Sequence, residues 1–292
     1  MNKWKTFLEL VRFPNLFTAM ADIMAGGWIA FGDWNQFNFI TVFSLLLSSA
    51  CFYAMGVALN DYVDYALDKI ERPERPLPSG RLNRSFVLVI VGIFGLCGLC
   101  ITYFVGWISF LIACALVISI CLYNVFLKES NFFGPVSMGL CRGLNLLLGI
   151  SVIPSQLSNF WWLSIVPFVY IAMVTALSKG EVGEALYPKR VWAMSVTINA
   201  CSIAVICFGG REKLLVTMLA VLLFLIWTLR GMYAALKKPN AVHIRKSVGT
   251  CIIGLPLLNA AIATSIGGMT AWLTVTLFML LSYAGSRVFS VT

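Results

Sequence analysis

The sequence predicts an all-α, polytopic membrane protein, a bundle of apolar helices. Of its 292 residues, 60% are hydrophobic and only 11% are charged, whereas a soluble domain carries about 25% charged residues. The apolar runs are continuous instead of alternating, which is typical of helical spans and not of a membrane β-barrel. So few charges cannot cover a soluble globule, and the composition also excludes a disordered chain and a disulfide-stapled secreted domain.

Ten apolar stretches are candidate spans, because a bilayer core of about 30 Å needs about 20 apolar residues per helix. Gly or Pro interrupts several of them, which neighbouring helices in a bundle tolerate. No linker or low-complexity segment separates the stretches, so we expect residues 1–292 to form a single membrane domain. In chain order the expected spans are 15–32, 37–59, 86–105, 107–126, 132–153, 160–178, 191–209, 214–236, 247–266 and 270–288.

The basic residues predict the topology, since Lys and Arg are retained on the cytoplasmic side of a membrane. With a cytoplasmic N-terminus, nineteen of the 21 Lys and Arg residues fall on that side, and only Arg211 and Lys213 fall outside. Membrane topology and anionic lipid headgroups therefore explain the net charge of +9. We expect a multi-pass protein of the lipid bilayer, in a bacterial inner (plasma) membrane, with no nucleic-acid partner.

Five of the twelve acidic residues lie within fourteen positions, at the end of the second expected span. They are Asp61, Asp64, Asp68, Glu71 and Glu74. If the helix continues past Asn60, the three aspartates share one face with it. Carboxylates crowded at the negative end of a helix dipole repel one another, and no base precedes Lys69 to make this an ordinary solvated face. The cluster predicts a bound Mg²⁺, which typically bridges one or two carboxylates to phosphate oxygens.

The segment after the cluster contains three prolines within six residues, which end the helix and stiffen the chain. Arg72 and Arg75 stand beside the aspartates in this segment, where guanidinium groups can fork onto phosphate oxygens. For Arg81 and Arg84, retention on the cytoplasmic side is a sufficient explanation. Asp61, Asp64 and Asp68 are thus the expected metal ligands of a Mg²⁺–diphosphate, with Asn60, Arg72 and Arg75 as further contacts.

The chain resembles the UbiA superfamily of intramembrane prenyltransferases in its first signature. The matching residues are Asn60-Asp61-x-x-Asp64-x-x-x-Asp68 and Arg72-Pro73-x-Arg75-Pro76-x-x-Ser79-Gly80. The resemblance implies an all-helical bundle with a nine-span core, to which the tenth span is an addition. It also implies an isoprenyl diphosphate substrate held by Mg²⁺, whose prenyl group is transferred to an acceptor. The acceptor is not identified by the sequence.

A second Asp-rich motif follows the sixth span in that superfamily, and here the chain departs from it. Residues 178–185 contain Glu181 and Glu184 but no D-x-x-x-D pattern, and Lys179 adds a positive charge. In one interpretation, Lys179 replaces a second cation in neutralising the diphosphate and Glu181 positions it. In the other, these are ordinary loop charges. The departure leaves a two-metal mechanism, and turnover itself, open.

Three further polar residues are embedded in apolar spans, where a charge is costly unless it faces a cavity or a partner. Asp22 lies about two turns into the first span and is expected to line a cavity. Arg142 and Asn145 are three residues apart in the fifth span and share a face. The buried arginine needs an anion, which diphosphate, Asp22 or an internal structural salt bridge would supply.

Two weaker matches to the superfamily suggest additional substrate contacts. Arg12-Phe13-Pro14-Asn15 is similar to its R-P-x-N entry to the first span, with the proline displaced by one, which implicates Asn15. Tyr123 and Lys128 are similar to its Tyr-x-x-x-Lys pattern, with one residue extra. Tyr123 would stabilise a carbocation with its ring face or act as an interfacial anchor.

Several stretches resemble the EboC-like subgroup of the superfamily more than the quinone-pathway enzymes. They are Gly139-Leu-Cys-Arg142-Gly-Leu-Asn145, Lys179-Gly-Glu-Val and the ending Arg287-Val-Phe-Ser-Val-Thr292, together with the surroundings of Asp22. We predict a Mg²⁺-dependent prenyltransferase. The alternative is a non-catalytic protein that binds or transports a prenyl diphosphate or a metabolite. A CDP-alcohol phosphotransferase is excluded because its Asp-Gly-x-x-Ala-Arg opening is absent.

Overall fold

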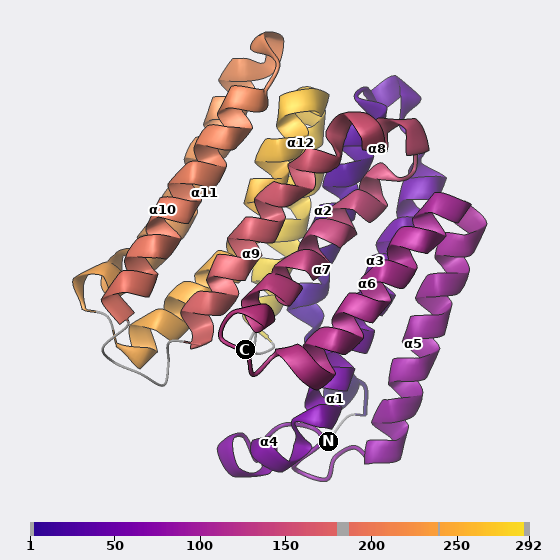
Figure 1. Cartoon of the computed structure of the whole chain (residues 1–292), viewed down its shortest axis with the longest axis vertical. Helices are drawn as coiled ribbons and strands as arrows, with labels where there is room; N and C mark the ends of the chain where they lie inside the picture. Colours follow the sequence, from indigo (N-terminus) through magenta and orange to yellow (C-terminus); the bar gives the residue numbers. More distant parts are fainter. Residues whose placement is uncertain (1–2, 180–186, 239, 289–292) are drawn as a thin grey trace.

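A computed structural model describes residues 3–179, 187–238 and 240–288, and these residues form helices and no strand. Figure 1 shows the helices running side by side along one axis. In chain order they are α1 (Lys3–Leu10), α2 (Phe13–Phe31), η1 (Trp34–Gln36), α3 (Phe39–Val63), α4 (Tyr65–Glu71), α5 (Arg84–Val105), α6 (Trp107–Leu122), η2 (Tyr123–Leu127), α7 (Phe133–Ile150), α8 (Pro154–Phe160), η3 (Trp161–Ser164), α9 (Ile165–Ser178), α10 (Tyr187–Phe208), η6 (Arg211–Lys213), α11 (Leu214–Lys237) and α12 (Ala241–Ser286).

Eight helical segments of the described chain are long and apolar enough to cross a membrane. The last of them, α12, has 46 residues but is broken at Gly268, whose φ of 69° and ψ of −150° are not helical. The chain reverses there, because Gly268 lies beside η6 while Gly285 packs against Pro14 at the start of α2. Counting the two arms of α12 separately and adding the 19-residue α2, the described segments agree with the ten expected spans. The predicted helical membrane fold is confirmed.

The centre of the bundle is α2, which packs against α12, α7 and α3. Its backbone touches that of α7, because a Cβ placed on Gly26 would lie 2.6 Å from the Cα of Gly149. Small residues allow such close approach between helices in a membrane. The contact brings Asp22, one turn before Gly26, against the polar residues of α7.

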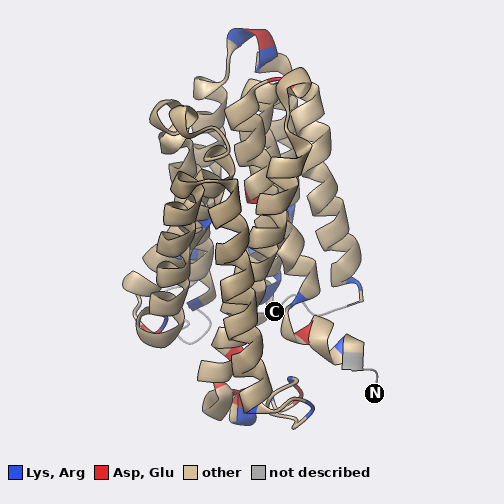
Figure 2. Cartoon of the chain, turned by 90° about the vertical axis from the view of Figure 1, so that its right-hand side faces the viewer, with Lys and Arg blue, Asp and Glu red and all other residues tan. Residues whose placement is uncertain are grey.

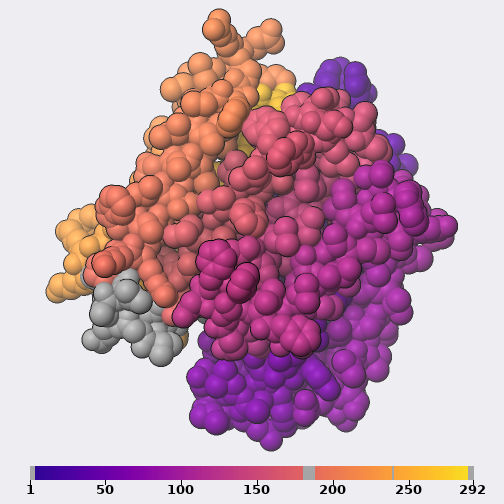
Figure 3. All heavy atoms as spheres, viewed as in Figure 1, coloured from indigo at the N-terminus to yellow at the C-terminus, as the bar shows by residue number. Residues whose placement is uncertain are grey.

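Most Lys, Arg, Asp and Glu residues lie toward the two ends of the bundle (Figure 2). One end carries the N-terminal helix and the segment between α3 and α5, which forms the lower end of the molecule in Figure 3. The opposite end carries η6, where Lys213 donates a hydrogen bond to the carbonyl of Ile266 beside the break in α12. Arg211 and Lys213, the two exceptions to the predicted charge pattern, thus lie apart from the acidic cluster. Which end faces the cytoplasm stays a prediction.

Candidate active site

The acidic cluster forms at the junction of α3 and α4. Helix α3 ends at Val63, and α4 begins at Tyr65 after Asp64, whose N–H still donates to the carbonyl of Asn60 (2.9 Å). Asp61 and Asp68 are buried and converge on one atom, Nη1 of Arg75, at 3.3 and 2.7 Å. Asp64 faces another way and forms an ion pair with Lys128, at the end of η2. The structure therefore brings two of the three predicted ligands together on one cationic group.

Arg75 lies in the loop between α4 and α5, which folds back toward the cluster. Leu77, only 2% exposed, packs with Leu10, Ala58, Val87 and Ile90. This anchor turns the chain back so that the Arg75 side chain points at the aspartates. Arg72, by contrast, is exposed and has no side-chain hydrogen bond or ion pair in the described chain, so its predicted contact with phosphate stays a prediction.

Arg12 is a second guanidinium at the cluster, with Nη2 3.2 Å from Oδ1 of Asp61. It lies between α1 and α2 with φ of 45°, a left-handed conformation that is uncommon for a residue with a side chain. Such outliers persist where the surroundings hold them and are common at ligand-binding sites. Asn15, three residues later, is buried near this turn, and its backbone carbonyl accepts a hydrogen bond from Thr18.

The pair Tyr123 and Lys128 owes its arrangement to η2, a single turn of π-helix. The N–H of Lys128 donates to the carbonyl of Tyr123, five residues earlier, at 2.9 Å. A five-residue step in a π-turn covers one turn, as a four-residue step does in an α-helix. The extra residue noted in the sequence is absorbed in this way, and Lys128 still reaches Asp64.

Lys179, at the end of α9, contacts backbone oxygens and none of the three aspartates. Its ammonium group donates to the carbonyls of Lys128 and of Ser130, the latter at 2.6 Å. Burial lowers the pKa of Lys179, and the nearby Glu129 carboxylate opposes this by favouring the charged form. Glu181 and Glu184 lie outside the described residues.

A second polar group is fully enclosed in the bundle. Oδ2 of Asp22, a residue with 0% exposure, accepts from Arg142 Nη1 (3.1 Å) and Asn145 Nδ2 (2.9 Å), and Oδ1 accepts from Asn259 Nδ2 (2.5 Å). Arg142 also donates to Thr18 Oγ1 (2.9 Å) and Ser49 to Asn145 Oδ1 (2.9 Å). We call Asp22, Arg142, Asn145 and Asn259 the buried network. It identifies Asp22 as the anion of Arg142, one of the alternatives that the sequence left open.

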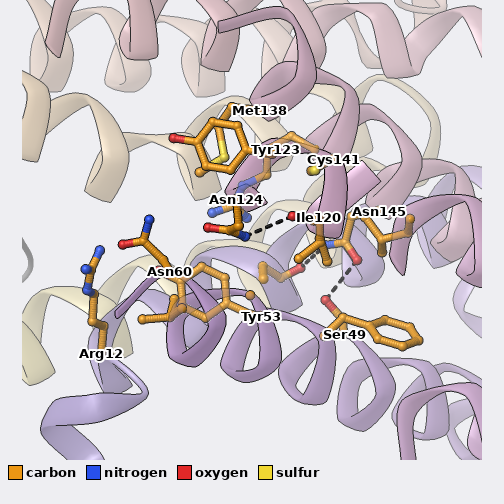
Figure 4. A pocket seen from close by; sticks show the side chains of 16 residues that line it. Arg12, Ser49, Tyr53, Asn60, Ile120, Tyr123, Asn124, Met138, Cys141 and Asn145 are labelled. Carbon is orange, nitrogen blue, oxygen red and sulfur yellow. Dashed lines mark hydrogen bonds between the residues drawn. The ribbon is translucent and has the colours of Figure 1, made fainter. Parts of the chain in front are cut away.

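A cavity of about 180 Å³ between α2, α3, α6, η2 and α7 lies between the two polar groups. Arg12, which contacts Asp61, lines it, as do Arg142 and Asn145 of the buried network, whereas Asp22, predicted to line a cavity, does not. Figure 4 shows Arg12 and Asn60 at one end and Ser49 and Asn145 at the other. Of the predicted site residues, Asn60, Tyr123, Arg142 and Asn145 line it. Its remaining lining residues are Arg12, Ala19, Ser49, Phe52, Tyr53, Gly56, Val57, Leu116, Ile120, Asn124, Met138 and Cys141. Sequence reasoning missed Ser49, Tyr53 and Asn124, because single polar residues in apolar spans carry no spacing signal.

The donor set at the mouth of this cavity fits a Mg²⁺ ion shared with a phosphate ligand. The described residues contain no group of three or more His, Cys, Asp or Glu that could enclose a metal. Two carboxylates, however, already converge on a cationic nitrogen, and Mg²⁺ bound with substrate phosphates needs only one or two carboxylates from the protein.

Comparisons with known proteins identify relatives of this chain. Digeranylgeranylglyceryl phosphate synthases are among the relatives: that of Korarchaeum cryptofilum is 26% identical, over 92% of this chain and 89% of its own length. That of Methanococcus maripaludis is 41% identical, but over only 31% of this chain and 34% of its own length. The chain thus spans about a third of the latter relative. The names of these relatives do not point to the EboC-like subgroup, so membership of that subgroup stays a prediction.

Solved structures share the fold. A UbiA homologue from Archaeoglobus fulgidus bound to GPP and Mg²⁺ has a TM-score of 0.65 at 14% identity, covering 97% of this chain and 99% of its own. A homologue from Aeropyrum pernix K1 has a TM-score of 0.64 at 13% identity, covering 85% of this chain and 96% of its own. The model of the UbiA prenyltransferase family matches residues 19–180, which include most of α2, the acidic cluster, η2 and Arg142. On this match, and on the helical fold around it, the chain belongs to the UbiA prenyltransferase family.

Proposed function

We propose that this protein is a Mg²⁺-dependent transferase that moves a prenyl group from an isoprenyl diphosphate to an acceptor bound in the cavity. The observation that carries the proposal is the convergence of Asp61 and Asp68 on Arg75 Nη1, beside Arg12, which contacts Asp61 and lines that cavity. Family membership supports it, and the Mg²⁺-bound fold neighbour is consistent with it. The names of the relatives make a glyceryl phosphate lipid the first acceptor to test.

The chemistry requires positive charge around the leaving diphosphate. Mg²⁺, held by Asp61 and Asp68 with Asp64 and Asn60 near it, would supply part of that charge. Arg12, Arg75 and Lys128 supply the rest: each now pairs with a carboxylate, and each can exchange it for a phosphate oxygen, since both are anionic oxygen acceptors. Fixed cations aimed at developing charge contribute strongly to catalysis in a site that excludes water.

Tyr123 would act on the prenyl side of the reaction. Its ring lines the cavity next to the acidic cluster. In the proposed reaction, the prenyl carbon becomes positively charged there as its bond to diphosphate breaks. The face of an aromatic ring attracts such a cation. We also infer that this end of the bundle faces the cytoplasm, because the basic residues of the expected inside loops lie there.

The test compares Asp68→Asn with Asp33→Asn, a matched change at an exposed carboxylate that caps η1. Purified protein in nanodiscs receives geranylgeranyl diphosphate, Mg²⁺ and a membrane lipid extract, and diphosphate release is measured. We expect release by the wild type and by Asp33→Asn, and loss in Asp68→Asn. Equal release by all three would contradict the proposal.

One observation favours a second candidate, a prenyl-diphosphate carrier without turnover. Lys179 lies where the family pattern has Asp-rich residues, and its ammonium group is engaged by two backbone carbonyls instead of a carboxylate. A carrier would bind geranylgeranyl diphosphate with Mg²⁺ but release no diphosphate with any acceptor extract. Product detection by lipid mass spectrometry therefore separates the two functions.

A further inference from the structure

Asn124 is a polar residue of the cavity that belongs neither to the acidic cluster nor to the buried network. It sits on the π-turn η2 and is 3% exposed. Its Nδ2 donates to the carbonyl of Ile120 at 2.9 Å, which fixes the orientation of the amide because a carbonyl oxygen can only accept a hydrogen bond. The Oδ1 atom is therefore the end of the amide that does not face Ile120, and in the view of Figure 4 the Asn124 side chain lies between those of Tyr123 and Tyr53.

The Oδ1 atom of Asn124 is buried and has no hydrogen-bond partner among the residues that the structure describes. An unpaired buried carbonyl oxygen is destabilising, and most such groups in proteins are paired. Asn124 lines the cavity, so a ligand bound there lies against this residue. Only a hydrogen-bond donor can pair with this oxygen, since it has lone pairs and no proton to give.

This requirement separates the two substrates of the proposed reaction. An isoprenyl chain has neither donor nor acceptor groups, and an ionised phosphate oxygen has no proton to donate. Packing either against Asn124 would leave its oxygen unsatisfied or repelled. The group that lies there is therefore part of the acceptor and carries an O–H or N–H bond.

Arg142 offers the complementary function on the same cavity. A guanidinium has five N–H donors, and the two hydrogen bonds that Arg142 makes in the described chain, to Asp22 and Thr18, leave three unused. Its charge is balanced by Asp22, so it can donate to a neutral oxygen without demanding an anion. Donor and acceptor on one cavity wall suit a hydroxyl group, which has both a proton and lone pairs.

We propose that Asn124 is a positioning residue for the acceptor, whose O–H or N–H group it binds through Oδ1. Asn124 thereby selects alcohols, phenols or amines over molecules that lack such a donor. This inference rests on the proposed function, because it assumes that the cavity takes the acceptor of a prenyl transfer.

The experiment uses two probe pairs that differ by one methyl group. The first is a monoalkyl glyceryl phosphate with a free 2-hydroxyl and its 2-O-methyl ether, and the second is 4-decylphenol and its methyl ether. Dissociation constants are measured on the full chain in nanodiscs with Mg²⁺ and the unreactive geranylgeranyl S-thiolodiphosphate. The variant is Asn124→Leu. Its matched control is Asn199→Leu, because exposed Asn199 makes the same bond one turn back, to Ser195 at 2.8 Å, on α10.

For at least one pair we expect the wild type to bind the free hydroxyl about tenfold more tightly than its ether, the value of one hydrogen bond. The ratio should fall to about one in Asn124→Leu and stay unchanged in Asn199→Leu. In turnover, the KM for the acceptor should rise in Asn124→Leu while the KM for geranylgeranyl diphosphate stays constant.

An unchanged ratio in Asn124→Leu overturns the inference. So does a wild type that binds the thiolodiphosphate with Mg²⁺ but shows no preference in either pair, a result that does not depend on the variant folding. Failure of the wild type to bind the thiolodiphosphate at all would instead overturn the proposed function. The two failures are therefore distinguishable.

Discussion

The acidic cluster and the buried network both pair aspartates with guanidinium groups, but in different surroundings. At the cluster, Asp61 contacts Arg12 and Arg75, which come from segments outside the membrane-spanning helices and are partly exposed. In the network, Asp22 is fully buried, and donors from α7 and α12 satisfy both of its oxygens. The first arrangement can exchange partners with a ligand, whereas the second cannot without opening the bundle. In the proposed function, the same kind of ion pair therefore serves ligand binding at the acidic cluster and packing in the buried network.

The largest effect is expected on protein stability, from a substitution in the buried network. Asp22→Asn leaves Arg142 as an uncompensated buried charge, and breaking such a pair from one side costs about 3–5 kcal/mol. We expect a large fall in the unfolding temperature of the purified protein. The double variant Asp22→Asn, Arg142→Met removes both charges and should recover most of the loss. A double variant as unstable as the single one would contradict this reading of the network.

At the mouth, the same kind of change should affect function and leave stability nearly intact. Asp68→Asn removes a carboxylate that Arg75 contacts at 2.7 Å, and in the proposed function a diphosphate oxygen replaces that contact. We expect turnover to fall by about 10²- to 10³-fold, the usual effect of removing one electrostatic group from an active site. Mg²⁺-dependent stabilisation by prenyl diphosphate should be lost in thermal unfolding curves. A large loss of stability without Mg²⁺ or ligand would show that the two regions do not differ as described.

The π-turn η2 positions Lys128 beside Asp64 at the acidic cluster, and a deletion tests whether the π-turn is required for this. Val125 is exposed on the π-turn, and deleting it makes Tyr123 and Lys128 four residues apart, which is one turn of α-helix. Lys128 should still reach Asp64, so we expect turnover within about threefold of the wild type, whereas Lys128→Met should lose about tenfold or more, the effect of a hydrogen bond to a charged group. Steady-state kinetics with the prenyl diphosphate checks this. A deletion as damaging as Lys128→Met would mean that the π-turn itself is required.

The two regions also differ in how far the sequence predicts them. The spans follow from continuous apolar runs, and the aspartates of the cluster from their spacing. The partners do not follow: Arg72 and Arg75 look alike beside their prolines, and only the burial of Leu77 aims Arg75 at the cluster. Asn259, Ser49 and Asn124 are single polar residues in apolar helices. Their role depends on which way each helix faces, and that is decided by packing across the bundle.

The smallest expected effect concerns Lys179, which joins α9 to the turn after η2. Its pKa is lowered by burial from the ordinary value of 10.5, with Arg190 acting in the same direction and Glu129 against it. We therefore expect the ammonium group to lose its proton below pH 10.5. We also expect kcat/KM to fall at alkaline pH, beginning in the same range below pH 10.5. Because folding favours the neutral form, the contribution of this group to stability should rise over the same pH interval. The pH profile of Lys179→Arg tests the assignment, since guanidinium stays protonated: its alkaline fall should move to higher pH. Superimposable profiles for wild type and variant would assign the fall to another group.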